Sequence, residues 1–302
     1  MMQCIELEND DMRVAVRADL GGGLAALEVN FDGQWIPVLR GNRNATWFND
    51  LACYVLAPWS NRIRDAEFSW EGNDVALRSD WKDGTAIHGD VKEARFEILD
   101  RSPQSVRMRV IRDGSKEQNW PWKYECTVRY QLDEMTLSLN VEVKNCDTRA
   151  MPSGIGLHPF FVTRLNNAAA AVSVPVAMRY TCEGMMPVGE TLDDELCQSL
   201  REGWKVKGGL DDVFSLHDSE FEASIAWPSV LRLKLTSRGG CGHAVMYSGE
   251  SGVEPAFFCL EPVTHVNDGM NLAVQGWKNT GVRVLRPGES VRLETSFEFA
   301  KP

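Results

Sequence analysis

The strongest constraint on the fold is an alternation of apolar and polar residues that recurs along the chain. It is clearest in five segments, which lie at 106–110, 124–132, 137–143, 231–235 and 291–299. In the last of these, Val291 and Leu293 alternate with the charged Arg292. A period of two places apolar side chains on one face of a strand and polar side chains on the other. The pattern predicts half-buried antiparallel strands, and we expect the segment at 291–299 to complete a sheet.

Helical periodicity is scarce by comparison. The best candidate is TLDDELCQSLREG at 191–203, in which leucine recurs at every fourth position from Leu192 to Leu200. Thr191 is expected to cap this helix and Gly203 to end it. We therefore predict one or few short helices, of which this segment is the only one that the sequence locates.

Nothing in the sequence divides the chain into separate units. No Pro/Ser-rich linker, low-complexity tract or internal repeat interrupts the 302 residues. Apolar residues make up 43% of the chain, enough to build a substantial core. We predict an all-β fold, a large antiparallel β-sandwich that forms a single domain over residues 1–302.

Charge and targeting features limit the possible partners. The chain has 32 basic and 43 acidic residues and a formal charge of −11, which disfavours nucleic acid as a partner. The acidic segment at 1–11 lacks the basic start and apolar run of a signal peptide. The most apolar stretch, at 168–178, is shorter than the roughly 20 residues that a membrane helix needs. We expect a cytoplasmic protein with no membrane partner and a small neutral ligand.

The usual cofactor motifs are missing from the sequence. The glycine-rich stretches do not match a dinucleotide fingerprint, and no phosphate-binding loop, HExxH motif, calcium loop or GxSxG motif occurs. The eight cysteines are scattered singly without a CxxC pair, which is typical of reduced and mostly buried thiols. We therefore expect no metal site and no cofactor.

Three of the five histidines, His88, His158 and His265, lie in segments that do not resemble ordinary strands. A lone histidine is more often a hydrogen-bonded structural residue than a catalyst. Glu261 follows the apolar run Ala256–Leu260 and precedes a proline, so a strand is expected to carry it inward and then end. This glutamate is either paired, desolvated with a raised pKa, or exposed at a sheet edge; the first two environments suit a general base.

Polar residues with two possible interpretations complete the candidates. Asn61, Arg62 and Arg64 precede a strand, where they either supply a fork of donors or are solvated at the surface. Asp211 is either a ligand or part of a turn or helix cap.

Five short segments, in this order, resemble motifs of the aldose 1-epimerase (galactose mutarotase) family. They are NRI at 61–63, IHGD at 87–90, GLHPFF at 156–161, LDDVF at 210–214 and LEPVTH at 260–265. The resemblance implies a large antiparallel β-sandwich of galactose mutarotase type that binds a free hexose in a cleft on one sheet. It also implies that the enzyme interconverts sugar anomers without a cofactor.

The resemblance assigns roles to individual residues. Glu261 matches the general base and His158 the general acid. Arg62, His88 and Asp211 match substrate-binding positions, and Asn61 is expected to join them. His265, together with Trp59 and Trp277, is a candidate to line the cleft.

Two alternatives to a free aldohexose mutarotase remain open. The first is a mutarotase of a phosphorylated or otherwise acidic sugar, which Arg64 is placed to meet. The second is a non-catalytic carbohydrate-binding protein on the same fold. Either a monomer or a homodimer is compatible with the sequence.

Overall fold

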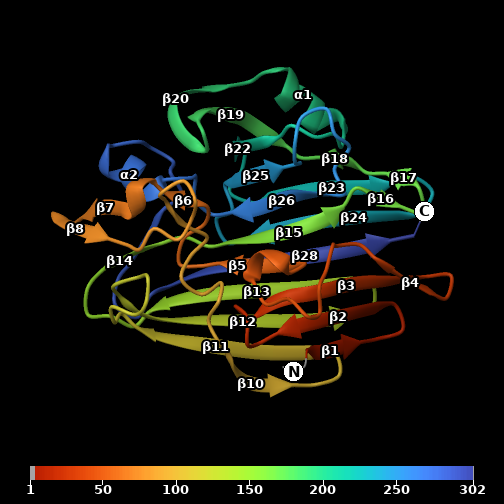
Figure 1. Cartoon of the computed structure of the whole chain (residues 1–302), viewed down its shortest axis with the longest axis horizontal. Coiled ribbons are helices and arrows are strands. Elements are labelled where there is room, and N and C mark those ends of the chain that lie inside the picture. Colours follow the sequence, from red (N-terminus) through yellow and green to blue (C-terminus); the bar gives the residue numbers. More distant parts are fainter. Residues whose placement is uncertain (1–3, 302) are drawn as a thin grey trace.

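A computed structural model describes residues 4–301, and two large antiparallel sheets dominate it (Figure 1). The nine-stranded sheet contains all five alternating segments, so the predicted strands are confirmed. Its strands, in spatial order, are β10 (Glu97–Arg101), β11 (Ser105–Asp113), β12 (Lys123–Asp133), β13 (Thr136–Asn145), β28 (Ser290–Ala300), β24 (Leu231–Arg238), β23 (Phe221–Trp227), β18 (Ala171–Ser173) and β21 (Trp204–Lys205). One face of its long strands is buried and the other is open to solvent, which is why their sequences alternate.

The second sheet has eleven strands and holds the site described below. Its order is β1 (Ile5–Glu8), β2 (Met12–Arg17), β3 (Gly23–Phe31), β5 (Cys53–Leu56), β15 (Gly156–Val162), β26 (Phe257–Val263), β25 (His243–Tyr247), β22 (Asp211–Leu216), β19 (Val176–Glu183) and β20 (Met186–Leu192), with β4 (Gln34–Pro37) paired to β3. Strands β5, β15 and β26 are buried along almost their whole length, so both faces of the middle of this sheet are covered.

The core lies between the two sheets. Alternate residues of the eleven-stranded sheet, such as Phe161 and Leu260, join the inward face of the nine-stranded sheet in one apolar cluster. The rings of Phe161 and Phe297, one from each sheet, are 6.4 Å apart. The other face of the eleven-stranded sheet belongs to a separate cluster that contains Tyr54 and Phe160. The predicted all-β sandwich is thus confirmed, and its second face carries further structure.

Short elements between the main strands complete the molecule. They form four two-stranded sheets, which pair β6 (Arg62–Ile63) with β9 (Ala86–Ile87), β7 (Glu67–Trp70) with β8 (Asn73–Ala76), β14 (Met151–Ser153) with β27 (Arg283–Leu285), and β16 (Arg164–Leu165) with β17 (Ala168–Ala169). Two single-turn 3₁₀ helices cover Phe48–Asp50 and Arg64–Ala66. The β6–β9 pair and the loops beside it border the candidate site.

Two short α-helices lie within residues 4–301, in agreement with the prediction of one or few. Helix α1 (Glu195–Glu202) ends at Gly203 as expected, but Asp194 caps it instead of Thr191. The side chain of Asp194 accepts a hydrogen bond from the backbone N–H of Cys197, because strand β20 continues to Leu192 and delays the start of the helix. Helix α2 (Gly269–Val274) was not predicted.

The described range omits Met1–Gln3 of the acidic N-terminal segment and also Pro302. Within residues 4–301, no helix is long and apolar enough to cross a membrane. Five of the eight cysteines are buried, which agrees with the prediction of mostly buried thiols.

Candidate active site

An imidazole and a carboxyl group meet at the centre of the eleven-stranded sheet. His158 lies on β15 and Glu261 on the neighbouring β26. Gly156 is opposite Val263 and Phe160 is opposite Cys259, so this register puts His158 opposite Glu261. The His158 Nε2 and Glu261 Oε1 atoms are 3.2 Å apart. Since side chains alternate along a strand, both groups point away from the sandwich core.

Burial sets the protonation of this pair. Glu261 is 2% exposed and His158 is 8% exposed. Desolvation raises the pKa of Glu261 well above its ordinary value. Desolvation, aided by the nearby charge of Arg40, lowers the pKa of His158 to about 3. Each group is therefore more stable in its neutral form, and one shared proton satisfies both.

The surroundings of Glu261 decide among the three environments considered from the sequence. The residue is both paired and desolvated, so the exposed alternative is wrong. The strand does not end there, because β26 continues to Val263. The second carboxyl oxygen, Oε2, is buried and has no hydrogen-bond partner among the described residues. A buried acceptor is rarely left unsatisfied, so a ligand hydroxyl would suit this atom.

The pair lies in a cavity of about 260 Å³ on the outer face of the sheet. Four of the five predicted substrate-binding residues line it: Asn61, Arg62, His88 and Asp211. The remaining lining residues are Arg40, Asn49, Tyr54, Trp81, Lys82, Ile87, Phe160, Val245, Tyr247 and Phe257. Rings, hydroxyls, amides and charges thus surround one carboxyl–imidazole pair, a composition suited to a polar ligand with apolar faces.

His88 and Arg62 form one wall of this cavity. Strand β6 pairs with β9 so that Arg62 is opposite Ile87, and His88 follows directly. The rings of His88 and His158 are 5.1 Å apart and nearly perpendicular. Burial and the neighbouring His158 lower the pKa of His88 well below its ordinary value, so this imidazole is neutral at pH 7. Arg62 donates through Nε to Asp83 (2.7 Å) and through Nη1 to Asn61 (3.1 Å), which fixes its guanidinium.

The backbone at His88 is in an uncommon conformation. His88 has φ = +59° and Gly89 has φ = +81°. A Cβ atom at position 89 would lie 2.1 Å from the carbonyl oxygen of Ala57, so glycine is required there. Lys92 donates through Nζ to the carbonyls of Ile87 (2.7 Å) and Gly89 (3.0 Å), on either side of His88. Asp80 pairs with Lys92 and accepts from the Ile87 N–H, so the two side chains clamp this turn.

Asp211 lies at the rim of the cavity, at the start of β22. It is opposite Tyr247, which in turn is opposite Cys259 of β26. Although the residue is exposed, desolvation by the surrounding wall raises the pKa of Asp211 to about 6. Its carboxyl group can accept a hydrogen bond from a hydroxyl at the cavity mouth.

Other expected lining residues lie elsewhere. His265 is buried; its Nε2 accepts from the backbone N–H of Ser60 (3.0 Å) and its Nδ1 donates to the Val266 carbonyl (2.7 Å). These bonds make it a structural histidine, and the expectation that it lines the cleft is wrong. Trp59 is fully buried against Trp120.

Two further residues face other surroundings. Trp277 lines a separate hollow that also contains His243. Arg64 lies outside the cavity and pairs with Asp268 at 3.5 Å, so it is not placed to meet an acidic substituent of a sugar bound there.

Several residues of the cavity were not among those predicted from the sequence. Tyr54 and Phe160 both pack against the ring of His158, at 4.6 and 4.5 Å, and their own rings are 6.0 Å apart. Phe160 could have been predicted, because it is two residues from His158 and so lies on the same face of the strand. Arg40 and Trp81 lie in loops, and their sequence surroundings carry no periodic pattern that could have identified them.

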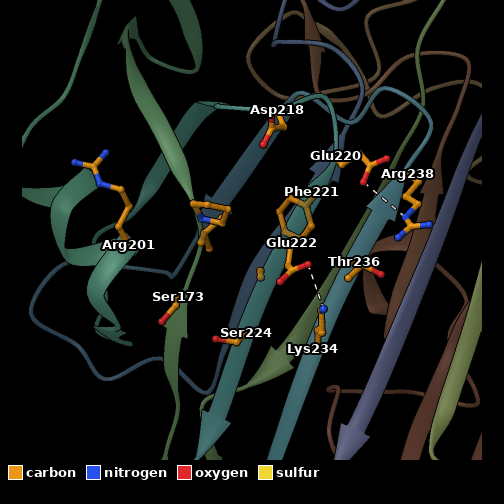
Figure 2. Close-up of a pocket in the computed structure, with 13 residues that line it drawn as sticks. Ser173, Arg201, Asp218, Glu220, Phe221, Glu222, Ser224, Lys234, Thr236 and Arg238 are labelled. Atoms are coloured by element: carbon orange, nitrogen blue, oxygen red, sulfur yellow. Dashed lines mark ion pairs between the residues drawn. The ribbon is translucent and has the colours of Figure 1, made fainter.

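A larger hollow of about 690 Å³ lies over β23 and β24 (Figure 2). Charged side chains on the solvent-facing side of β23 and β24 and just before β23 line it and pair with one another, Lys234 with Glu222 and Arg238 with Glu220. Neither a histidine nor a buried carboxyl group is among its lining residues. Acid–base chemistry therefore points to the smaller cavity.

Comparison with known proteins identifies the family to which the chain belongs. A model of the family described as aldose 1-epimerase matches residues 3–298. The chain belongs to the aldose 1-epimerase family. The family match covers both large sheets and every residue of the cavity described above.

Individual members of the family are distant in sequence. The uncharacterized protein YphB of Escherichia coli K12 is 24% identical over 280 residues, which cover 88% of this chain and 90% of that protein. A galactose mutarotase-like protein from Clostridium acetobutylicum has a similar structure, with a TM-score of 0.83 and 20% identity over 99% of this chain and 95% of that one. The galactose 1-epimerase of Lactobacillus acidophilus has a TM-score of 0.76 and 15% identity over 98% and 94% of the two chains. These structures share the galactose mutarotase-like fold.

Proposed function

We propose that this protein is an aldose 1-epimerase that interconverts the α and β anomers of an aldohexose with a free anomeric hydroxyl. The main observation in support is the buried Glu261–His158 pair, 3.2 Å apart, at a cavity of about 260 Å³. A hemiacetal opens when its O1 loses a proton while its ring oxygen O5 gains one. These two oxygens are bonded to the same carbon, so neighbouring acid and base groups can reach both.

In the proposed reaction, ionised Glu261 accepts the proton of O1 and protonated His158 donates a proton to O5. The C1–O5 bond breaks, C1 becomes an aldehyde, and O5 becomes a hydroxyl. Rotation about the C1–C2 bond presents the other face of the aldehyde. The reverse transfers then close the ring as the other anomer, and both side chains return to their starting states.

Burial and pairing act in opposite directions on the two proton arrangements of the pair, and the reacting arrangement is reached from the neutral one by proton transfer from Glu261 to His158. Attraction between an ionised glutamate and a protonated histidine at 3.2 Å favours the charged arrangement. Desolvation of both groups favours the neutral arrangement. Ring opening converts the charged pair into the neutral pair, and ring closure does the reverse, so neither direction requires an isolated buried charge.

The surrounding residues are proposed to hold the sugar. Arg62 and His88 are positioned to bind hydroxyls, Asn61 orients Arg62, and Asp211 accepts a hydroxyl at the rim. Aromatic side chains such as Phe160 and Trp81 offer faces for the apolar side of a pyranose ring.

The proposal is tested by following the anomerisation of freshly dissolved α-glucose and α-galactose by polarimetry or exchange NMR. The wild-type protein is expected to accelerate it above the spontaneous rate. Glu261→Gln and His158→Asn should each lower kcat by about 10²- to 10⁴-fold, the usual contribution of a general acid or base. Glu298→Gln and His217→Asn, which alter exposed residues away from the cavity, should retain wild-type rates.

Two results would contradict the proposal. If the wild-type protein bound sugars without changing the anomerisation rate of any of them, it would be a binding protein. If it were active but both cavity variants kept full activity in the folded state, the acid–base assignment would be wrong. Circular dichroism of each variant separates loss of chemistry from loss of folding.

A further inference from the structure

Arg40 is an unusual member of the cavity wall because it has no acidic partner. Its guanidinium lies over the ring of Phe160 (3.6 Å to the centroid) and over that of Phe257 (4.3 Å). Its Nη2 donates to the carbonyl of Asn49, and its buried Nε has no hydrogen-bond partner. Across residues 4–301, no carboxylate forms an ion pair with Arg40.

Comparable arginines elsewhere in the chain are neutralised. Arg17 pairs with Asp19 at 2.7 Å, and Arg112 pairs with Asp90 at 2.8 Å. Desolvation lowers the pKa of Arg40, but the guanidinium keeps its positive charge, since this group stays protonated in proteins. The main carboxylate that acts on Arg40 is Asp50, which is exposed and acts on it without forming an ion pair. A partly buried cation without a paired counter-charge is unfavourable unless a ligand supplies one. Contact with two aromatic faces offsets part of that cost, but Nε remains without a hydrogen-bond partner.

The position of Arg40 relative to the proton-transfer pair is informative. Phe160 contacts both His158, at 4.5 Å between the rings, and Arg40, whose guanidinium lies 3.6 Å from its centroid. Phe160 is two residues from His158 along β15, a displacement of about 7 Å along the strand. A pyranose with O5 at the pair and its C5 substituent directed along β15 would bring that substituent to Arg40. Asp211 lies three strands from Phe160 in the sheet order, roughly 14 Å away, too far to neutralise Arg40.

We propose that the sugar acted on carries an anionic group, such as the carboxylate of a hexuronate, that pairs with Arg40 in the cavity. This inference rests on the proposed function and narrows its substrate class. A second cation, Lys82, lines the same cavity and makes no ion pair with the described residues. The formal charge of −11 does not oppose the pairing, because distant surface charges are screened within about 10 Å at ordinary ionic strength.

An anion paired with Arg40 would also favour proton donation from His158 to O5. The charge of Arg40 contributes to the depressed pKa of His158. An anion on the guanidinium cancels that charge, which favours the protonated imidazole that donates to O5. A neutral sugar leaves the repulsion between the two cations in place.

The experiment compares kcat/KM for anomerisation of glucuronate, galacturonate and glucose 6-phosphate with that for glucose and galactose, for wild type and for Arg40→Met. In the wild type, kcat/KM for at least one anionic sugar should be about tenfold or more above that for its neutral counterpart. Arg40→Met should lower kcat/KM for that sugar by about 30-fold or more, in line with the loss of one partner of a desolvated charge pair. Because the substitution also removes the repulsion between Arg40 and protonated His158, it should not lower kcat/KM with neutral sugars, and a modest rise is expected. The carboxylate and phosphate arms distinguish the two kinds of anion.

Arg64→Met is the matched control, because Arg64 lies outside the cavity, and it should leave all substrates unaffected. Arg40→Lys keeps the charge and should retain part of the preference for the anion. A wild-type preference for neutral sugars, or equal losses for both classes in a folded Arg40→Met protein, would overturn the inference while the epimerase function stands. Absence of turnover with every sugar would instead refute the proposed function itself.

Discussion

Glu261 shows how burial can prepare a residue for proton transfer. The carboxyl group is held among apolar neighbours of the central strands, and His158 supplies its hydrogen-bonding partner. The apolar run before Glu261 in the sequence predicted an inward-facing group. It could not predict the partner, because His158 is distant in the chain and only the register of β15 and β26 brings the two together.

His265 illustrates the opposite case at the same scale. Its motif suggested a lining residue as strongly as that of His158 did. In the structure, both of its ring nitrogens are bonded to backbone groups, Ser60 N–H and the Val266 carbonyl. Side-chain direction just beyond a strand end depends on the following turn, and local sequence does not determine it.

Glu261 is expected to make stability depend on pH in a specific direction. Its pKa in the folded protein lies above its ordinary value of 4.5. The stability contributed by the protonated form is therefore complete below about pH 4.5 and is lost as the pH rises through the folded-state pKa. Glu261→Gln does not titrate, so its free energy of unfolding minus that of the wild type should increase with pH, by up to about 1.4 kcal/mol per pH unit. Urea unfolding between pH 4.5 and 8 measures this difference, and a constant difference would show that the pKa is not raised.

Some strands can be predicted from their sequences more readily than others. Strands β11, β12, β13, β24 and β28 alternate because one face meets solvent. Strands β15 and β26 do not alternate, since the sandwich core covers one face and the cavity walls cover the other. The sequence thus predicted the sheet that lacks the candidate site better than the sheet that carries it.

The two helices also differ in how clear a sequence pattern they carry. Helix α1 is eight residues long and one of its faces packs inward, so its pattern could be recognised. Its start was misplaced because Leu192, which fits the helical spacing, ends strand β20. Helix α2 has only six residues, too few for a periodic pattern to emerge.

The turn around His88 should respond to loss of its clamp. Lys92→Met removes the donors to the Ile87 and Gly89 carbonyls while keeping most of the apolar stem. Because His88 then loses the support for its positive φ, we expect kcat/KM to fall by about 10- to 100-fold, the usual effect of misplacing a group near the reacting atoms. Anomerisation kinetics measure it.

The control for the clamp is Lys144→Met, which alters an exposed lysine of β13. Asp80→Asn should give a smaller loss than Lys92→Met, since it leaves the two carbonyl contacts in place. Wild-type kinetics in a folded Lys92→Met protein would show that the clamp does not position His88.

At the scale of the whole molecule, the C-terminal strand links distant parts of the chain. The segment at 291–299 was expected to complete a sheet, and β28 does so from within, between β13 and β24. Its inward residues therefore contact both halves of the nine-stranded sheet and the facing sheet. Such long-range pairing cannot be inferred from local alternation, which identifies a strand but not its neighbours.

The central place of β28 predicts a large effect from one truncation. Phe297 is fully buried and packs across the interface near Phe161. Phe297→Ala should lower the free energy of unfolding by about 3–5 kcal/mol, through lost burial and the cavity left behind. Glu298→Ala, on the solvent-facing side of the same strand, should change it by less than about 0.5 kcal/mol. Urea denaturation of both variants measures the contrast, and similar values for the two would contradict the role of β28.

Strands β15 and β26 serve the core with one set of alternate residues and the cavity with the other. Insertion or deletion of a single residue in either strand would swap the two sets and turn a carboxyl or imidazole group into the apolar interior. These strands therefore tolerate substitutions better than a change in length by one residue. The loops that supply Arg40, Trp81 and Lys82 are free of this constraint, so residues can be added there without changing the register of the proton-transfer pair.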